Sequence, residues 1–190
     1  MGSKTPWLWI VGGPNGAGKT TFCRDFLPLW VETYKYLNAD LMAAGLSPLD
    51  PSRAPISAGR LMLQQIEAAA KARETFAVET TLSGGTYFDL ALKLKRQGWK
   101  VGVVYLWLRS DKIALDRVAK RVLLGGHSIP DETVIRRRVR GHAALPKYLK
   151  LADQWLAFDN SGAKPDLVAA GQNGNNVNYR PMQAIEMGLL

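Results

Sequence analysis

The feature that most constrains this chain is a glycine-rich octapeptide, Gly13-Pro-Asn-Gly-Ala-Gly-Lys-Thr20, which matches the pattern G-x-x-x-x-G-K-[ST] of phosphate-binding loops, or P-loops. The apolar run Trp7–Val11 precedes it, and a helical pattern over residues 18–27 follows it. Glycines allow backbone N–H groups to converge on phosphate oxygens, and the start of a helix adds a partial positive charge. The succession of buried strand, loop and helix therefore predicts an α/β fold that binds a polyphosphate. The alternative is a glycine-rich turn that caps a helix and binds nothing.

Each residue of the octapeptide is a candidate for binding the phosphates of ATP. Lys19 is expected to reach the β- and γ-phosphates, and the Thr20 hydroxyl is expected to ligate Mg²⁺. Thr21 is grouped with them, with helix capping or packing as its alternative role. The predicted nucleotide-binding residues of this segment are Gly13, Pro14, Asn15, Gly16, Ala17, Gly18, Lys19, Thr20 and Thr21.

Short β-type runs alternate with longer helical patterns along the rest of the chain, which is typical of a parallel sheet covered by helices on both faces. We expect a three-layer P-loop NTPase fold with a five-stranded, mainly parallel sheet in nucleoside-kinase-like order. The expected strands cover residues 7–11, 34–38, 75–79 and 101–108, with weaker candidates at 155–158, taken as the fifth strand, and 167–170. The expected helices cover residues 18–27, 57–73, 87–97, 112–124 and 131–148.

Two prolines and a glycine bear on the ends of these helices. Pro28 is expected to end the first helix at residue 27, and Gly141 or Pro146 is a candidate interruption of the last one. We expect a single domain over residues 1–170. Residues 171–190 then form an Asn- and Gly-rich tail whose structure the sequence leaves open, apart from a short helix after Arg180-Pro181.

Two acidic residues end predicted strands at the edge of the sheet where the P-loop lies. Asp40 follows the second strand, and a carboxylate there can accept the proton of an attacking hydroxyl, as in kinases. The alternative role for Asp40 is a helix N-cap. Glu79 ends the third strand after apolar and small residues, as in a Walker B element, and would hold the water shell of Mg²⁺. Its alternative is a structural ion pair with a neighbouring Lys or Arg.

Short polar side chains follow Glu79 at the same edge and suit contacts with a polar substrate. The predicted substrate-binding residues are Arg60, Glu79, Thr80, Thr81 and Ser83. Farther along, Asn160 follows the fifth predicted strand and carries an amide donor and acceptor, which suits the edge of an adenine base. An Asx-turn is the alternative for Asn160.

Basic residues are concentrated between Arg109 and Lys150, where 11 Lys/Arg face four Asp/Glu, while the net charge of the whole chain is +9. Arg117 and Arg121 are four residues apart and share a helix face, and the run Arg136–Arg138 lies on the next helix. Arginine suits the stabilisation of charge spread over a phosphoryl group. The segment over residues 112–142 is therefore expected to be a lid over the triphosphate, with a solvated basic face as the alternative.

A glycine pair, Gly125-Gly126, separates the two arginine-bearing helices and would serve as the hinge of this lid. His127 follows it, either as a phosphate contact or as a capping or packing residue. The stretch over residues 112–142 contains no Phe, Tyr or Trp, which counts against a basic nucleic-acid-binding module, since such modules interleave aromatic and basic residues.

Composition excludes several further classes of protein. The single cysteine, Cys23, cannot form an internal disulfide, and with two histidines the chain cannot build a Cys/His metal cluster. The apolar runs are shorter than the roughly 20 residues of a membrane span. The N-terminal residues lack the apolar core of a signal peptide. We expect a cytoplasmic protein that does not contact a membrane.

Several motifs in this order resemble the zeta-toxin-like P-loop kinases, which include predicted ATPases and UDP-N-acetylglucosamine kinases. The matching segments are GGPNGAGKTT (12–21), NADLMAAGLSP (38–48), ETTLSG (79–84), YLWL (105–108), GGHSIPDE (125–132), IRRR (135–138) and DNSG (159–162). Zeta toxins transfer the γ-phosphate of ATP to a sugar hydroxyl of UDP-N-acetylglucosamine. The resemblance implies that Lys19 and Thr20 bind ATP and Mg²⁺ and that Asp40 is the catalytic base. It also implies Arg121 and one of Arg136–Arg138, taken here as Arg137, as transition-state arginines.

Residues and resemblance together predict an ATP- and Mg²⁺-dependent kinase that phosphorylates a small hydroxyl-bearing substrate, such as a nucleotide sugar. The resemblance also implies an antitoxin protein as a partner. Two alternatives stay open. One is a P-loop ATPase without a small-molecule acceptor, and the other is a basic nucleic-acid-binding module.

Overall fold

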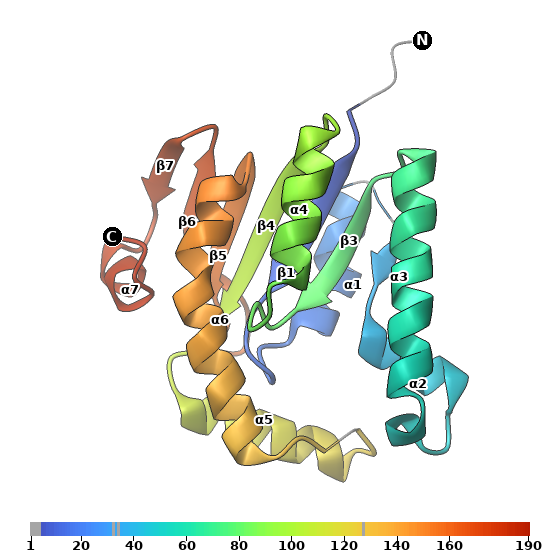
Figure 1. The fold of residues 1–190 in the computed structure, drawn as a ribbon. Coiled ribbons are helices and arrows are strands. Elements are labelled where there is room, and N and C mark those ends of the chain that lie inside the picture. Colours follow the sequence, from blue (N-terminus) through green and yellow to red (C-terminus); the bar gives the residue numbers. More distant parts are fainter. Residues whose placement is uncertain (1–4, 32, 34, 127) are drawn as a thin grey trace.

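The computed structural model describes residues 5–31, 33, 35–126 and 128–190. One sheet, in the strand order β2-β3-β1-β4-β5-β6-β7, lies between two layers of helices (Figure 1). The strands are β1 (Trp7–Gly12), β2 (Tyr36–Leu37), β3 (Phe76–Thr80), β4 (Lys100–Trp107), β5 (Gln154–Asp159), β6 (Asp166–Gln172) and β7 (Asn175–Asn178). The helices are α1 (Lys19–Trp30), α2 (Ala39–Leu46), α3 (Pro55–Ala72), α4 (Thr86–Arg96), α5 (Asp111–Leu123), α6 (Asp131–Leu151) and α7 (Pro181–Glu186), with a 3₁₀ turn at Pro51–Arg53.

The central strand β1 explains why its sequence is apolar throughout. Leu8 and Ile10 belong to a core with side chains of α3, α4, α6 and α7, while Trp9 and Val11 belong to a second core with α1 and α5. Alternate side chains of a strand point to opposite faces, so a strand covered on both sides has no polar face. The two cores confirm the three-layer α/β arrangement expected from the sequence.

Strands β2, β3, β1, β4 and β5 are parallel, as expected for a P-loop fold. The sheet has seven strands rather than five, because β6 and β7 add an antiparallel edge next to β5. Strand β6 was the weaker candidate at 167–170, and β7 was missed. The turn between them, Asn173-Gly174, has positive φ at both residues (50° and 86°), the geometry that Asn-Gly favours in tight hairpins.

Two helices continue past the residues that were expected to end or interrupt them. Helix α1 continues through Pro28 to Trp30, so the expectation that Pro28 ends it was wrong. Proline removes one backbone bond, to the carbonyl of Arg24, and this residue is exposed, so water can satisfy that carbonyl. Helix α6 runs without a break past Gly141 and Pro146. Helix α2 was not predicted at all, although Asn38 provides it with a regular N-cap.

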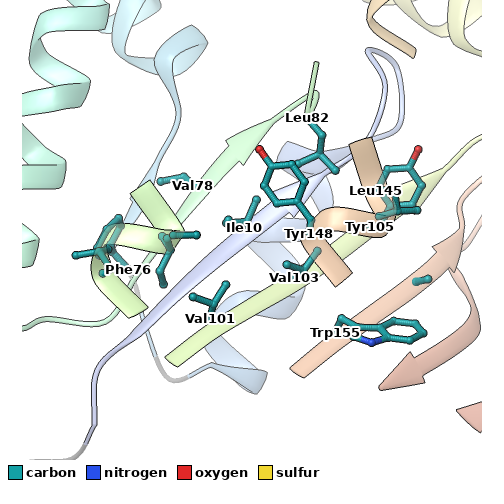
Figure 2. Close-up of a cluster of buried hydrophobic side chains, with 14 of the residues drawn as sticks. Ile10, Phe76, Val78, Leu82, Val101, Val103, Tyr105, Leu145, Tyr148 and Trp155 are labelled. Atoms are coloured by element: carbon teal, nitrogen blue, oxygen red, sulfur yellow. The ribbon is translucent and has the colours of Figure 1, made fainter. Parts of the chain in front are cut away.

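Gly141 shows how α6 docks onto the sheet. A Cβ built there would lie 2.1 Å from the carbonyl oxygen of Thr81, so only glycine allows this approach of the helix to the turn after β3. Leu82 of that turn and Leu145 and Tyr148 of α6 share one apolar cluster (Figure 2). The contact fixes the turn after β3 next to the P-loop.

The C-terminal segment packs onto the same body. The short helix expected after Arg180-Pro181 is α7, and its side chains at Ala184 and Met187 are buried in the core that α6 covers. Within the described part of the chain, none of the helices combines the length and apolar character that a bilayer span requires.

Candidate active site

The P-loop (Gly13–Thr20) connects β1 to α1 at the carboxyl edge of the sheet. Gly13 has φ of 149°, and a Cβ there would lie 2.4 Å from the carbonyl oxygen of Leu106, so the loop passes too close to β4 for any other residue. Helix α1 begins at Lys19, and its N-cap, Gly18, provides no side-chain acceptor for the first-turn N–H groups. Those N–H groups lie at the positive end of the helix and suit an anionic ligand.

Lys19 is nearly buried, with 6% of its surface exposed. Its Nζ donates a hydrogen bond to the carbonyl oxygen of Pro14 at 2.8 Å and lies 3.8 Å from Oε1 of Glu79. Burial lowers the pKa of Lys19, while the charges of Glu79 and Asp40 act in the opposite direction. The site therefore favours a charged Lys19 most when an additional anion lies beside it.

Glu79 is the centre of a hydrogen-bond network at the end of β3. Its Oε2 accepts hydrogen bonds from Oγ1 of Thr20 at 2.9 Å, from Nδ2 of Asn38 at 2.8 Å and from the hydroxyl of Tyr36. Asn38 Nδ2 also donates to the Tyr36 hydroxyl at 2.9 Å. The network joins P-loop, β2 and β3, so the carboxylate has one defined orientation. Oε1 of Glu79 lies 3.8 Å from Nζ of Lys19, while the hydrogen bonds that Oε2 accepts come from three polar, uncharged side chains.

Sequence reasoning missed two members of this network. Asn38 stands at the end of the predicted strand 34–38, so its position at the carboxyl edge could have been a signal. Tyr36 lies within the strand, and no local pattern marks it. Asn38 also caps α2, since its Oδ1 accepts hydrogen bonds from the N–H groups of Asp40 (2.8 Å) and Leu41 (3.2 Å). The N-cap alternative for Asp40 is therefore wrong.

Asp40 lies exposed in the first turn of α2 and lines a cavity of about 510 Å³ over the P-loop. Its position leaves the carboxylate accessible to a ligand in that cavity. Besides residues of the P-loop, the cavity brings together predicted site residues from three further elements: Asp40 of α2, Glu79 of β3 and Arg121 of α5. Its lining residues are Asn15, Gly16, Gly18, Lys19, Thr20, Thr21, Asn38, Asp40, Leu41, Ala44, Pro51, Glu79, Arg117, Arg121, Gly125 and Gly126.

Other predicted substrate residues lie outside the lining of this cavity. Thr80 Oγ1 accepts a hydrogen bond from the N–H of Leu82 at 3.0 Å, and the hydroxyls of Thr81 and Ser83 are 2.8 Å apart. These bonds shape the turn after β3. Arg60 is exposed on α3.

The arginine run of α6 is also outside the lining. Arg137 is half-buried on that helix. Arg138 donates to Oδ1 of Asp111 at 2.7 Å and to the carbonyl of Leu108 at 3.0 Å, while Arg136 donates to Thr133. Arg138 therefore ties α6 to the start of α5. His127, in the connection between these helices, lies outside the described residues.

Asn160 lies on the other side of the P-loop, where its Nδ2 donates to the carbonyl of Ala17 at 2.7 Å. The Asx-turn alternative was wrong for Asn160, because Asp159 forms the turn by accepting the N–H of Ser161 at 2.9 Å. Asn160 lines a second cavity of about 570 Å³. This cavity is lined by Gly16, Gly18, Thr21, Phe22, Asp25, Phe26, Arg117, Asn160, Gly162, Ala163, Lys164 and Pro165.

Arg117 separates the two cavities and lines both. Its guanidinium donates to the carbonyls of Asn160 (2.7 Å), Ser161 (3.1 Å) and Gly162 (3.0 Å). One arginine therefore holds the loop after β5 against α5 and the P-loop. The two cavities also share Gly16, Gly18 and Thr21 in their linings, so they lie next to each other along the P-loop.

Comparisons with known proteins place the chain among its relatives. No family model matches it. An uncharacterised protein of Haemophilus influenzae is 33% identical over 134 residues, which cover 67% of this chain and 94% of that protein. The chain belongs to the family of this H. influenzae protein.

Solved structures resemble the fold at low sequence identity. The AvrRxo1-ORF1:-ORF2 complex with ATP superposes with a TM-score of 0.78 at 14% identity over 96% of this chain, which spans 63% of the length of that neighbour. A chain of the PezAT chromosomal toxin–antitoxin system of Streptococcus pneumoniae gives 0.65 at 17% identity, covering 97% of this chain and 78% of its own. A putative kinase of Chloroflexus aurantiacus gives 0.57 at 17% identity, covering 73% and 80%. These neighbours confirm the α/β P-loop kinase-like fold.

Proposed function

We propose that the protein is an ATP- and Mg²⁺-dependent phosphotransferase that acts on an alcohol group of a small molecule. The observation that carries this proposal is the single cavity that joins a P-loop lysine to an exposed carboxylate on a different element. Lys19 begins α1, which follows β1, and Asp40 lies in the first turn of α2, which follows β2. Phosphate binding and acceptor activation are thus assigned to separate groups that face the same space.

The nucleotide would span the two neighbouring cavities. Its phosphates would contact the N–H groups of the P-loop and Lys19, and its base would enter the second cavity beside Asn160. The Asn160 side chain donates to Ala17, which leaves its Oδ1 for the base, and Arg117 lies between the two cavities. A structural neighbour that contains ATP supports a nucleotide in this fold.

Thr20 and Glu79 fit a magnesium ion bound together with the nucleotide. The described residues contain no group of three or more His, Cys, Asp or Glu side chains that could hold a metal alone. Mg²⁺ in phosphoryl-transfer sites takes one or two protein ligands and completes its shell with phosphates and water. Thr20 would ligate the ion through its hydroxyl oxygen, and the Glu79 carboxylate, which accepts a hydrogen bond from that hydroxyl at 2.9 Å, would hold the water shell of the ion. The ion would supply positive charge beside the phosphates.

Asp40 is assigned the role of general base toward the acceptor hydroxyl. It is exposed to the cavity, and the helix cap beside it is provided by Asn38, so its own carboxylate is not used for capping. A proton passing to Asp40 would leave the acceptor oxygen free to attack the γ-phosphorus, and the bond from that phosphorus to the ADP oxygen would break.

Arg121 lines the cavity and would stabilise charge on the phosphoryl group in transit. Arg137 lies outside the lining, so its participation requires that residues 112–142 close over the nucleotide. Gly125 and Gly126, which line the cavity between α5 and α6, give this segment its hinge.

For the acceptor we propose a sugar hydroxyl, with nucleotide sugars such as UDP-N-acetylglucosamine as the first candidates, on the basis of the motif resemblance to zeta toxins. The likeness to a chain of a toxin–antitoxin system supports an antitoxin protein as a partner. We propose a cytoplasmic location, since the reaction uses ATP and Cys23 is a free, buried thiol.

Mass spectrometry of possible acceptors tests this function. The protein is incubated with ATP and Mg²⁺ together with a panel of nucleotide sugars and nucleosides. Phosphotransferase activity predicts that at least one acceptor gains one phosphate, and that the Lys19→Ala variant produces none. ATP consumption with every acceptor unchanged would instead identify an ATPase.

A further inference from the structure

One oxygen of Glu79 carries an unusual number of hydrogen bonds. Oε2 accepts from Thr20, Asn38 and Tyr36, whereas Oε1 faces Nζ of Lys19 at 3.8 Å. A carboxylate oxygen with three donors has little remaining capacity to bind a cation or its water. The oxygen oriented toward the phosphate site is therefore Oε1.

Tyr36 is placed for this contact by the sheet itself. Strand β2 pairs with β3 so that Tyr36 lies opposite Ala77 and Leu37 opposite Val78. Its ring is partly buried, and its hydroxyl donates a hydrogen bond to Oε2 of Glu79.

Two of the three donors have an additional task, whereas Tyr36 lies outside the lining of the P-loop cavity. Thr20 belongs to the P-loop, and Asn38 caps α2, so replacing either one disturbs more than Glu79. The Tyr36 hydroxyl contacts Glu79 and the Asn38 amide and does not line the P-loop cavity. It does not touch the space where the nucleotide would lie.

We propose that Tyr36 is a positioning residue for the magnesium site: its hydroxyl fixes Oε2 of Glu79 so that Oε1 is presented to the water shell of the ion. This inference rests on the proposed function, because it concerns the same Mg²⁺–ATP site. Loss of the Tyr36 hydroxyl therefore weakens the enhancement of ATP binding by Mg²⁺. The contacts that ATP makes with the P-loop in the absence of Mg²⁺ stay intact.

The variant Tyr36→Phe tests this role, because phenylalanine keeps the ring and removes only the hydroxyl. ATP affinity is measured by calorimetry in EDTA and across a Mg²⁺ titration, which gives a readout independent of turnover. We expect the Mg²⁺ concentration for half-maximal enhancement of binding to rise about tenfold, as for loss of a hydrogen bond to a charged group. We expect ATP affinity in EDTA to be unchanged and turnover to recover at saturating Mg²⁺.

Tyr179→Phe is the matched control, since Tyr179 is exposed and follows β7 on the far edge of the sheet. A double-mutant cycle with Glu79→Gln adds a second measurement. If Tyr36 acts through Glu79, Tyr36→Phe has no further effect on the Mg²⁺ response once Glu79 is replaced.

Three outcomes overturn the inference. The first is an unchanged Mg²⁺ response in Tyr36→Phe, and the second is an equal loss of ATP affinity with and without Mg²⁺, which marks a structural role. The third is a full effect of Tyr36→Phe in the Glu79→Gln background. Failure of the proposed function looks different, because the wild-type protein would then show no Mg²⁺-dependent ATP binding to perturb.

Discussion

Replacing Asp40 by asparagine separates acceptor activation from nucleotide binding. Asparagine has nearly the same size as aspartate but cannot take up a proton from an acceptor hydroxyl. We expect phosphoryl transfer to fall by about 10²- to 10⁴-fold, the usual contribution of a positioned general base. Transfer is measured with saturating Mg²⁺–ATP and the acceptor identified by mass spectrometry.

The structure limits the side effects of this substitution. The N-cap of α2 is Asn38, so the cap hydrogen bonds to the N–H groups of residues 40 and 41 persist. What is lost is one exposed negative charge in the first helical turn, which contributes about 0.3–1 kcal/mol to stability through the helix dipole. For a domain of this size, that corresponds to a decrease of roughly 1–4 °C in melting temperature. ATP affinity should stay within about fivefold of the wild-type value, since an exposed charge contributes at most about 1 kcal/mol to an ionic contact.

Asp89→Asn is the matched control for Asp40→Asn. Asp89 is exposed in the first turn of α4, so it carries the same helix-dipole contribution, and it does not line the P-loop cavity. We expect it to reproduce the small stability loss and to keep full transfer activity. Wild-type transfer rates in Asp40→Asn would refute the catalytic-base assignment. Activity rescued by excess Mg²⁺ would assign Asp40 to the metal instead.

The other predictions concern Lys19, Arg121 and Gly141. Lys19→Met should abolish ATP binding in calorimetry while keeping the fold. Because burial lowers the pKa of Lys19 from 10.5, the unfolded chain binds a proton that the folded chain has lost at pH values between the lowered pKa and 10.5. Stability of the unliganded protein in urea should therefore rise with pH in this window, and less so in Lys19→Met. Arg121→Ala should lower kcat by about 10²- to 10⁴-fold with little change in the KM for ATP, because the Arg121 side chain acts on charge that develops in the transition state. An effect on KM alone would contradict this role. Gly141→Ala should destabilise the protein by about 2–4 kcal/mol in urea unfolding, because the new Cβ would lie 2.1 Å from the carbonyl oxygen of Thr81. The control is Gly59→Ala in α3, whose Cβ meets no atom within 4 Å and which should be neutral or stabilising.

The parts of the fold that follow from local sequence were predictable. The P-loop requires a strand before it and a helix after it, and the apolar run before it indicated a strand buried on both faces. Asp40 and Glu79 could be located because the carboxyl ends of parallel strands meet at one edge. Their presence in the lining of one cavity agrees with that expectation.

The missed features depend on packing or on turn chemistry. Tyr36 reaches Glu79 only because β2 pairs with β3, and no pattern within the strand indicates this contact. The role of Arg117 in holding three carbonyls after β5 depends on how α5 lies against the sheet. Strand β7, in contrast, was signalled by Asn173-Gly174, a pair that favours a two-residue hairpin turn.

The fate of the γ-phosphate tests the central claim most directly. ATP labelled in its γ-phosphate is incubated with Mg²⁺, the acceptor panel and either the wild-type protein or Asp40→Asn. The account predicts that the wild-type protein transfers the label to an organic acceptor and that Asp40→Asn binds ATP but transfers at least about a hundredfold less. Label that appears only in inorganic phosphate, at the same rate in both proteins and regardless of acceptor, would contradict it.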